Sequence, residues 1–358
     1  MKFCLSCLSF PLVPLTACAL ILGTPLRSQS QEAVPYLVGT GTQLELVGFP
    51  IRSPALDTGT VNSVAGTLIG WSPSFGDRPF GSGLRTGQEY YAEVVGPAGH
   101  AWLGHRLELD EAASRTRTDH GLVIAASTDN TRGMPNTTLA GARLEIRPHL
   151  TVPGLMQDTI ERRVIHGGEK TESFQFFLPS SDGSNFWAIP FVSGKGGTFW
   201  VDQKTLRTVP GSQLVVPPGS SVGMMFGNLR GLNIGLTGEA GNTPVAKPLL
   251  AGFNFASYPF SRDMRVGLDW GNQASGFRGA NSPRGADRIE IPIGNRRLIY
   301  SPESGAGSNA LRWRMVNPAR RQEWKQPAEY LDQIPVGQGF LIWKSQPDSN
   351  HFFYPPKP

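Results

Sequence analysis

Arginine and tryptophan side chains gather in one stretch near the end of the sequence. Those that could act together on a ligand are Arg312, Trp313, Arg314, Arg321 and Trp324. Arginine beside tryptophan suits stacking on a sugar ring or a base, and the guanidinium charges suit an anionic polymer. This stretch is the candidate ligand-binding site of the chain, with an anionic glycan as the leading candidate ligand.

The same residues also have a purely structural interpretation. On a β-strand successive side chains alternate between the two faces, so Trp313 would pack inward while Arg312 and Arg314 face solvent. The pair Asn317-Pro318 would then form the turn of a β-hairpin. We favour this interpretation, which needs no ligand, and keep the binding site as the alternative.

His100 and His105 lie near Glu108 and Asp110, a set of side chains that could hold a metal ion. If the segment is a strand, however, residues five positions apart point to opposite faces of the sheet. The two imidazoles could then share an ion only across a bulge. We therefore predict no metal site and no cofactor.

The search for catalytic residues yields only weak candidates. Glycoside cleavage needs two carboxyl groups facing each other, and Glu108 with Glu145 or Asp263 with Asp269 could supply them. Acids on solvated strand faces explain these pairs better. We predict no catalytic residues and keep a secreted glycan hydrolase or lyase as a second alternative.

Two turns organise the elements that would position these side chains. Pro335 and Gly337 form a Pro-x-Gly turn that directly precedes an apolar run, and Pro217 and Gly219 do the same earlier in the chain. Such a turn stops one strand and starts another. Because aligning the prolines also aligns the glycines and the apolar runs, the pattern predicts a structural unit that is used twice.

Period-two alternation of apolar and polar residues recurs along the chain and predicts strands. Residues 143–147, Arg-Leu-Glu-Ile-Arg, are a clear example, and turn residues separate short strands throughout. Many short strands joined by turns are typical of β-sandwiches and β-barrels. The sequence therefore predicts an all-β fold with two or three small sandwich or barrel-like domains.

A glycine-containing stretch at residues 166–168 resembles a linker and helps to divide the chain. We predict an N-terminal β domain over 31–160, a β unit over 161–250 and another β unit over 251–358. Each of the last two contains one of the Pro-x-Gly turns. These two units are therefore candidates for a divergent repeat.

Residues 1–30 have the pattern of a secretory signal peptide, in which a lone charge at Lys2 precedes an apolar centre and small residues follow. Cys4, Cys7 and Cys18 all lie within it, so the exported part would have no disulfide and no thiol nucleophile. We predict export to the cell envelope or the extracellular space. A lipid anchor on Cys18 is the less favoured alternative.

Charge and hydropathy bear on two further classes of function. The formal net charge is +5, and removing Lys2 and Arg27 with the signal leaves 5 − 2 = +3. This excess is too small to predict nucleic-acid binding. After residue 30 no run supplies the ~18 apolar residues that a membrane span needs. We predict neither a nucleic-acid partner nor a transmembrane span, and the oligomeric state is left open.

Several motifs occur in a fixed order along the chain. They are Gly48-Phe49-Pro50-Ile51, the runs 252–260 and 285–289, the pair Trp313-Arg314 and the run 334–340. In this order they resemble a conserved, uncharacterised family of secreted proteins found chiefly in verrucomicrobial genomes. The resemblance implies export, a β-rich architecture and no assigned activity, and it supplies no catalytic residues. This sequence departs from the family by an insertion at 317–326.

Together these observations predict an exported, non-enzymatic structural or adhesion-type protein. The first alternative is a carbohydrate-binding module that uses exposed tryptophans, with Trp200, Trp313, Trp324 and Trp343 as candidates. Extracellular polysaccharide and other envelope components are the expected partners.

Overall fold

The computed structural model describes most of the chain after residue 30. The described segments are residues 31–38, 45–73, 83–119, 121–125, 138–155, 174–179, 186–194, 197–201, 205–226, 232–266, 276–293, 296–304, 311–317, 320, 323–324 and 333–353. Strands dominate them, and helices such as α1 (Glu111–Arg115) are short. The all-β prediction is confirmed. Within these segments no helix is both long enough and apolar enough to cross a membrane.

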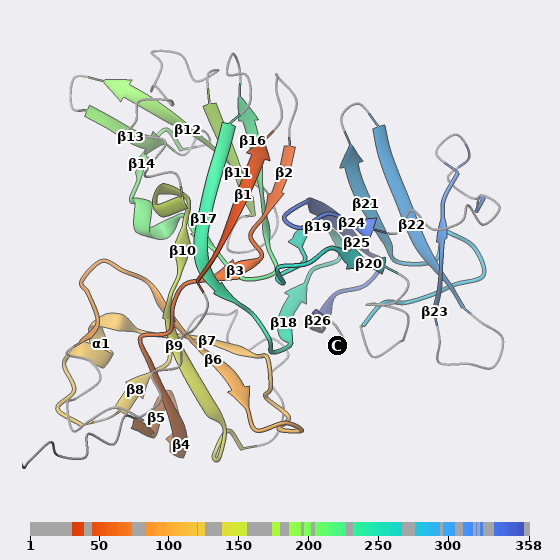
Figure 1. Ribbon diagram of the computed structural model, residues 1–358. Coiled ribbons are helices and arrows are strands. Elements are labelled where there is room, and N and C mark those ends of the chain that lie inside the picture. Colours follow the sequence, from red (N-terminus) through yellow and green to blue (C-terminus); the bar gives the residue numbers. More distant parts are fainter. Residues whose placement is uncertain are drawn as a thin grey trace, which may run out of the picture. The chain divides into compact units, whose positions relative to one another are not determined.

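Six antiparallel strands form a sheet that closes on itself. Their spatial order is β7 (Arg106–Glu108), β6 (Tyr90–Gly96), β9 (Arg143–Pro148), β4 (Asp57–Ala65), β5 (Leu68–Pro73) and β8 (Gly121–Val123) (Figure 1). The outer strands meet where Leu109 bridges Ile124, and the amide of Ala125 donates to the Glu108 carbonyl at 2.8 Å. This closed sheet is barrel-like in form.

The interior of the closed sheet is apolar, as strand alternation requires. Ala92 and Val94 of β6 point inward together with Leu144 of β9, and all three are fully buried. On the outer face of the same two strands, Glu93 and Glu145 are buried as well. Because these charged side chains are buried, other strands must cover the outer face. The covering strands and their charged residues are described below.

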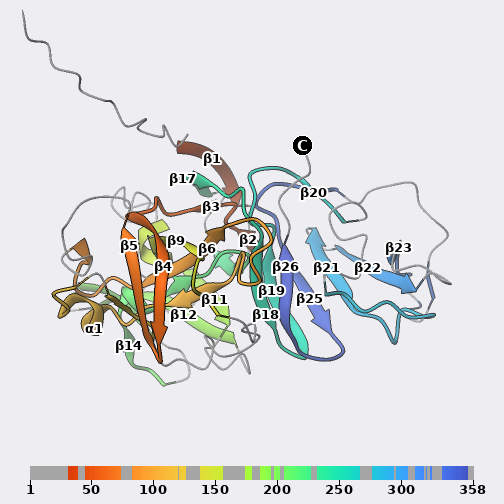
Figure 2. The same cartoon turned by 90° about the horizontal axis from the view of Figure 1, so that it is seen from below.

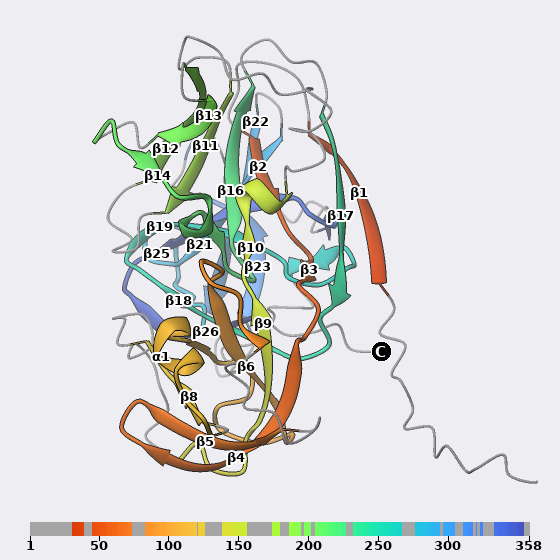
Figure 3. The ribbon, with the colours of Figure 1, turned by 90° about the vertical axis from the view of Figure 1, so that its left-hand side faces the viewer.

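A second antiparallel sheet contains six strands. Their order is β14 (Thr208–Val209), β13 (Gly197–Val201), β12 (Phe186–Gly194), β11 (Phe174–Pro179), β16 (Ser221–Phe226) and β2 (Glu45–Gly48), and Figure 3 shows β11, β12 and β16 side by side. The last pairing joins strands that are far apart in the sequence. It places Gly48 of β2 opposite Ser221 of β16.

The third sheet has five antiparallel strands. Their order is β19 (Gly252–Ser257), β25 (Gly339–Lys344), β21 (Arg288–Ile293), β22 (Arg296–Ser304) and β23 (Leu311–Met315), and Figure 2 shows β19, β25, β21 and β22 in that sequence. One face of the sheet supplies a hydrophobic core that includes Ile289, Tyr300 and Ile342. Its opposite face carries the arginines discussed below.

Short ribbons complete the fold. β1 (Gln31–Val38) pairs with β17 (Leu232–Ala240), which also pairs with β3 (Ile51–Arg52), and the two-stranded ribbons are β10 (Leu150–Thr151) with β15 (Val215–Val216), β18 (Val245–Leu249) with β26 (Asp348–Phe353) and β20 (Met264–Arg265) with β24 (Gln333–Ile334). β1, β2 and β3 lie within the predicted domain 31–160, yet they pair with strands of the predicted unit 161–250. Strand pairing thus crosses that predicted limit.

The two Pro-x-Gly turns have the same backbone geometry. The amide of Ser220 donates to the Pro217 carbonyl and the amide of Gln338 donates to the Pro335 carbonyl, each at 3.0 Å. The glycines at the third turn position have φ values of 78° at Gly219 and 77° at Gly337. This conformation strains any residue with a Cβ atom, which is why both turns carry glycine there.

Candidate functional site

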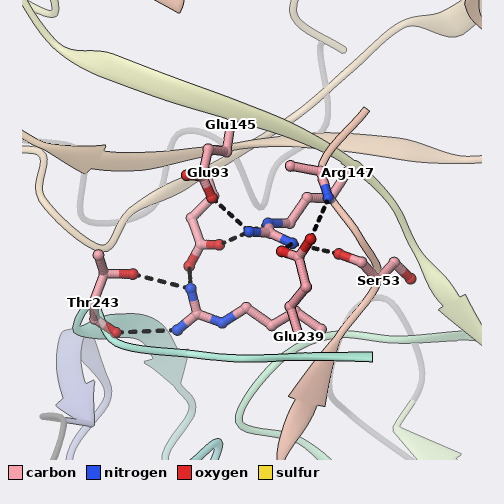
Figure 4. A network of polar contacts seen from close by, with 8 residues as sticks. Ser53, Glu93, Glu145, Arg147, Glu239 and Thr243 are labelled. Carbon is pink, nitrogen blue, oxygen red and sulfur yellow. Dashed lines mark hydrogen bonds and ion pairs between the residues drawn. The ribbon is translucent and has the colours of Figure 1, made fainter. Parts of the chain in front are cut away.

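A group of charged side chains lies where β3 and β17 meet the outer face of the closed sheet (Figure 4). Arg52 of β3 donates to Glu93 of β6 at 2.5 Å, and Arg147 of β9 donates to Glu239 of β17 at 2.6 Å. Arg147 also donates to Glu145, its neighbour on β9, at 2.5 Å. We call these five residues the buried charge network.

Pairing within the buried charge network leaves little scope for proton-transfer chemistry. Arg52 is 2% exposed and Glu93 is fully buried. Charges so far from water are stable only when they are paired, and each carboxylate here has a guanidinium partner. Burial, reinforced by the charge of Glu93, raises the pKa of the adjacent Tyr91. The network therefore suits a structural role, holding β3 and β17 against the closed sheet.

The candidate carboxylate pair Glu108 and Glu145 is divided between two different ion pairs. Glu108 contacts His149 at 2.5 Å, whereas Glu145 contacts Arg147. Burial opposes the charged form of Glu108, but the hydrogen bond with His149 and that residue's charge leave the pKa of the carboxyl lowered. The expectation of a solvated strand face is wrong for Glu145, which is buried, because β17 covers that face of β9 through the network.

The other candidate acids and histidines have local structural contacts. Asp263 accepts a hydrogen bond from the amide of Val336 at 2.9 Å and so supports the second Pro-x-Gly turn, and Asp269 lies outside the described residues. Burial, followed by the charge of Arg106, lowers the pKa of His105 to about 4. Among the described residues no group of three or more acids, histidines or cysteines is placed to hold a metal ion.

The structure divides the predicted arginine–tryptophan patch between the two faces of β23. The ring of Trp313 packs edge-on against Phe277, with 4.9 Å between centroids, on the core side of the sheet. Arg312 and Arg314 alternate with Trp313 and belong to the opposite face. Arg321 lies outside the described residues. Strand alternation thus directs Trp313 into the core, as the hairpin interpretation requires.

Arg314 and Trp324 do come together. The guanidinium carbon of Arg314 lies 5.2 Å from the Trp324 ring centroid, within the range of a cation–π contact. Arg314 also pairs with Glu303 at 3.1 Å, and Val316 bridges Trp324 across the strand. The Nε of Arg314 and the indole Nε1 of Trp324 are both buried without a hydrogen-bond partner in the described part of the chain. Two adjacent donors thus lack acceptors among the residues that the structure describes.

A second stack of the same kind lies on this face, and of its members the sequence predicted Trp343 alone as a candidate. Phe253, Trp343 and Arg288 are neighbours across β19, β25 and β21. The guanidinium carbon of Arg288 lies 4.3 Å from the Trp343 centroid and 5.5 Å from the Phe253 centroid. Phe253 is 42% exposed, which is unusual for a phenylalanine.

The two stacks belong to one row of side chains. In the register of the sheet, Ser301 of β22 stands between Arg288 and Arg314. The name arginine–aromatic face is used below for the five residues that form the stacks, Phe253, Arg288, Arg314, Trp324 and Trp343.

Arginine outnumbers acid on the face of the third sheet that carries the two stacks. Glu290 pairs with Arg288 and with Arg297, each at 2.8 Å, and Glu303 pairs with Arg314. Among the described side chains of this face, four arginines (288, 297, 312 and 314) therefore oppose two glutamates (290 and 303), an excess of 4 − 2 = +2. The Arg297 side chain is 50% exposed. The face thus combines aromatic surface with positive charge.

Comparison with known proteins adds no functional assignment. The chain matches no protein-family model and no curated protein.

Proposed function

We propose that the chain is an exported, non-enzymatic adhesion-type protein whose arginine–aromatic face binds an anionic polysaccharide. The observation that carries the proposal is the row in which Phe253, Trp343 and Arg288 lie next to Arg314 and Trp324. Along it two aromatic rings and a guanidinium are followed by Ser301, a second guanidinium and a third ring. Residues 1–30, with their signal-peptide pattern, support export to the cell envelope or the extracellular space.

The chemistry of the face fits a chain of charged sugars. A sugar ring offers an apolar side to an aromatic ring, while its carboxylate or sulfate groups suit the planar fork of arginine. An uncharged polysaccharide would use the rings but not the excess of two positive charges.

The proposal is tested by titrating the mature protein with a polyuronate, a sulfated glycan and a neutral glucan while tryptophan fluorescence is recorded. Trp324 and Trp343 belong to the face, so we expect the two anionic polymers to change the emission and the glucan to have little effect. Added salt should weaken binding because the charges are partly exposed.

Matched variants locate the site. Arg288→Ala and Arg314→Ala should each weaken binding about tenfold, because each removes a charge from the row. Arg278→Ala removes the same charge from an exposed arginine that donates to Gln346, and it should bind like the wild type. A flat fluorescence response to both anionic polymers, or equal losses in all three variants, would refute the proposal. Release of reducing ends during the titration would favour a glycan hydrolase instead.

A further inference from the structure

The second and third sheets share one strand order. Starting from β2, the order in the second sheet is β2-β16-β11-β12-β13. Starting from β19, the order in the third sheet is β19-β25-β21-β22-β23, and in both sheets every neighbouring pair is antiparallel. In both sheets the first strand pairs with a strand that follows a Pro-x-Gly turn. In both sheets the other three strands form a meander, and in the sequence this meander lies between the first strand and its partner.

The ribbons around these two sheets correspond as well. β10 pairs with β15 just before the first turn, and β20 pairs with β24 just before the second. β1, which precedes β2, pairs with the strand that follows β16, and β18, which precedes β19, pairs with the strand that follows β25. Each pairing of the third sheet and its ribbons thus has a counterpart in the other set, which in addition pairs β13 with β14 and β17 with β3.

The residue register agrees with this correspondence. Two positions after the turn glycine, Ser221 lies opposite Gly48 in the second sheet, and Gly339 lies opposite Ser257 in the third. Following the register across the sheets makes Trp200 equivalent to Trp313. Trp200 is buried against Phe176, with 5.2 Å between ring centroids, much as Trp313 packs on the core of the third sheet.

Contacts between the two turns are reciprocal. The amide of Gly48 donates to the Gly337 carbonyl at 2.7 Å, and the amide of Ser257 donates to the Gly219 carbonyl at 3.0 Å. Exchanging each residue for its equivalent converts one hydrogen bond into the other. In an isologous interface, residue i of one copy contacts residue j of the other, and residue j of the first contacts residue i of the second. Interfaces of this kind lie across a two-fold axis.

Equivalent positions also face each other directly. A Cβ atom on Gly48 would lie 2.3 Å from the Ser257 Cβ, and one on Gly339 would lie 2.7 Å from the Ser221 Cβ. Each pair consists of one glycine and one serine. This is expected where an internal two-fold axis brings two equivalent positions so close that only one of them has room for a side chain.

We infer that residues 31–52 with 150–240, and residues 245–353, are two copies of one strand unit joined as in a two-fold dimer. The closed sheet of residues 57–148 is then an insertion into the first copy. The turns form an interaction surface whose partner is the second copy within the same chain. This division differs from the predicted units 161–250 and 251–358 because strands β1 and β2 supply the beginning of the first copy.

A functional consequence follows, which rests on the proposed function. In the first copy the positions equivalent to Arg288, Glu290 and Arg314 are Gln175, Phe177 and Val201, none of which is charged. The arginine–aromatic face therefore belongs to the second copy alone. Each chain should bind polysaccharide at one site of this type and not at two.

The duplication is tested in the full chain by exchanging the glycine and the serine of the equivalent positions 48 and 257. The Ser257 hydroxyl donates to the Ser220 carbonyl at 2.7 Å, and the carbonyl equivalent to this acceptor is that of Gln338. In the variant G48S/S257G the new serine should therefore find the Gln338 carbonyl. We expect G48S/S257G to be more stable than G48A/S257G, with a roughly fivefold smaller unfolding constant.

The reference value is the contribution of the Ser257 hydroxyl to the free energy of unfolding. It is the difference between the wild type and Ser257→Ala, both measured by denaturant unfolding. Equal hydroxyl contributions at positions 48 and 257 support the duplication. A hydroxyl at 48 that contributes nothing, or a G48S/S257G variant that fails to fold, would overturn it. Calorimetric titration with a short anionic oligosaccharide separates the two proposals, because two sites per chain contradict the single-site consequence while no binding contradicts only the proposed function.

Discussion

Lys247 is a buried lysine at the junction of the two copies, and its acceptors among the described residues are neutral. Its Nζ donates to the Ser220 hydroxyl at 2.6 Å and to the carbonyls of Phe255 at 2.7 Å and Gly219 at 3.3 Å. Burial, followed by the charge of Arg106, lowers its pKa from 10.5 to about 7. A carboxylate partner would have the opposite effect.

The lowered pKa makes stability depend on pH in a defined window. Between pH 7 and 10.5 the unfolded chain binds a proton at Lys247 that the folded chain does not, so the free energy of unfolding should rise with pH there. Below pH 7 both states are protonated and this contribution is constant. We expect Lys247→Met to reduce the slope measured by urea unfolding between pH 7.5 and 9.5. A variant with the wild-type slope would show that Lys247 titrates normally.

At the scale of elements, the matched turns make a paired prediction. Gly219→Ala and Gly337→Ala each place a Cβ atom on a residue with a φ near +77° or +78°, which should lower the free energy of unfolding by about 1–2 kcal/mol. Because the turns have the same geometry, the two losses should be similar. Gly83→Ala is the control, since an added Cβ there meets nothing within 4 Å. Losses that differ by more than twofold would contradict the equivalence of the turns.

Local elements of this fold are predictable from the sequence because their causes are local. Alternation around Trp313 predicts its inward direction, and Pro217 and Pro335 mark where new strands begin. Phe253 and Arg288 illustrate what local patterns miss. They lie on strands separated in the sequence and become neighbours of Trp343 only through β25. The arginine–aromatic face is therefore predictable only when the strand pairing is known.

The same limit applies to the charge network. Arg52 and Glu93 are ordinary charged residues in their own strands, and nothing nearby marks them as buried. Their partners are fixed only when β3 meets the outer face of β6. Long-range pairing also decides which copy β1 and β2 complete. The linker-like stretch at 166–168 and the two turns therefore predicted a different division of the chain.

At the scale of the whole molecule, the buried charge network connects the closed sheet to strands of the first copy. Arg147 of the closed sheet donates to Glu239 of β17 and to the Ser53 carbonyl just after β3. Gly104 forms another link, because its carbonyl accepts from the amide of Ala246 at 2.9 Å. If the closed sheet is an insertion, the Arg147 contacts hold it to the first copy and the Gly104 contact holds it to the second, so that the three parts unfold together.

Arg147→Met should uncouple the closed sheet from the rest. It leaves Glu145 and Glu239 without their guanidinium, a loss of about 3–5 kcal/mol for a broken buried pair. In hydrogen-exchange mass spectrometry under mild denaturant, wild-type peptides from 90–96 and 288–293 should open with one common free energy. In the variant the first should open at a lower free energy than the second. Arg278→Met replaces an exposed arginine and should leave the opening free energies of both peptides unchanged. If the opening free energy of both peptides fell equally in Arg147→Met, the sheets would remain one cooperative unit without the network.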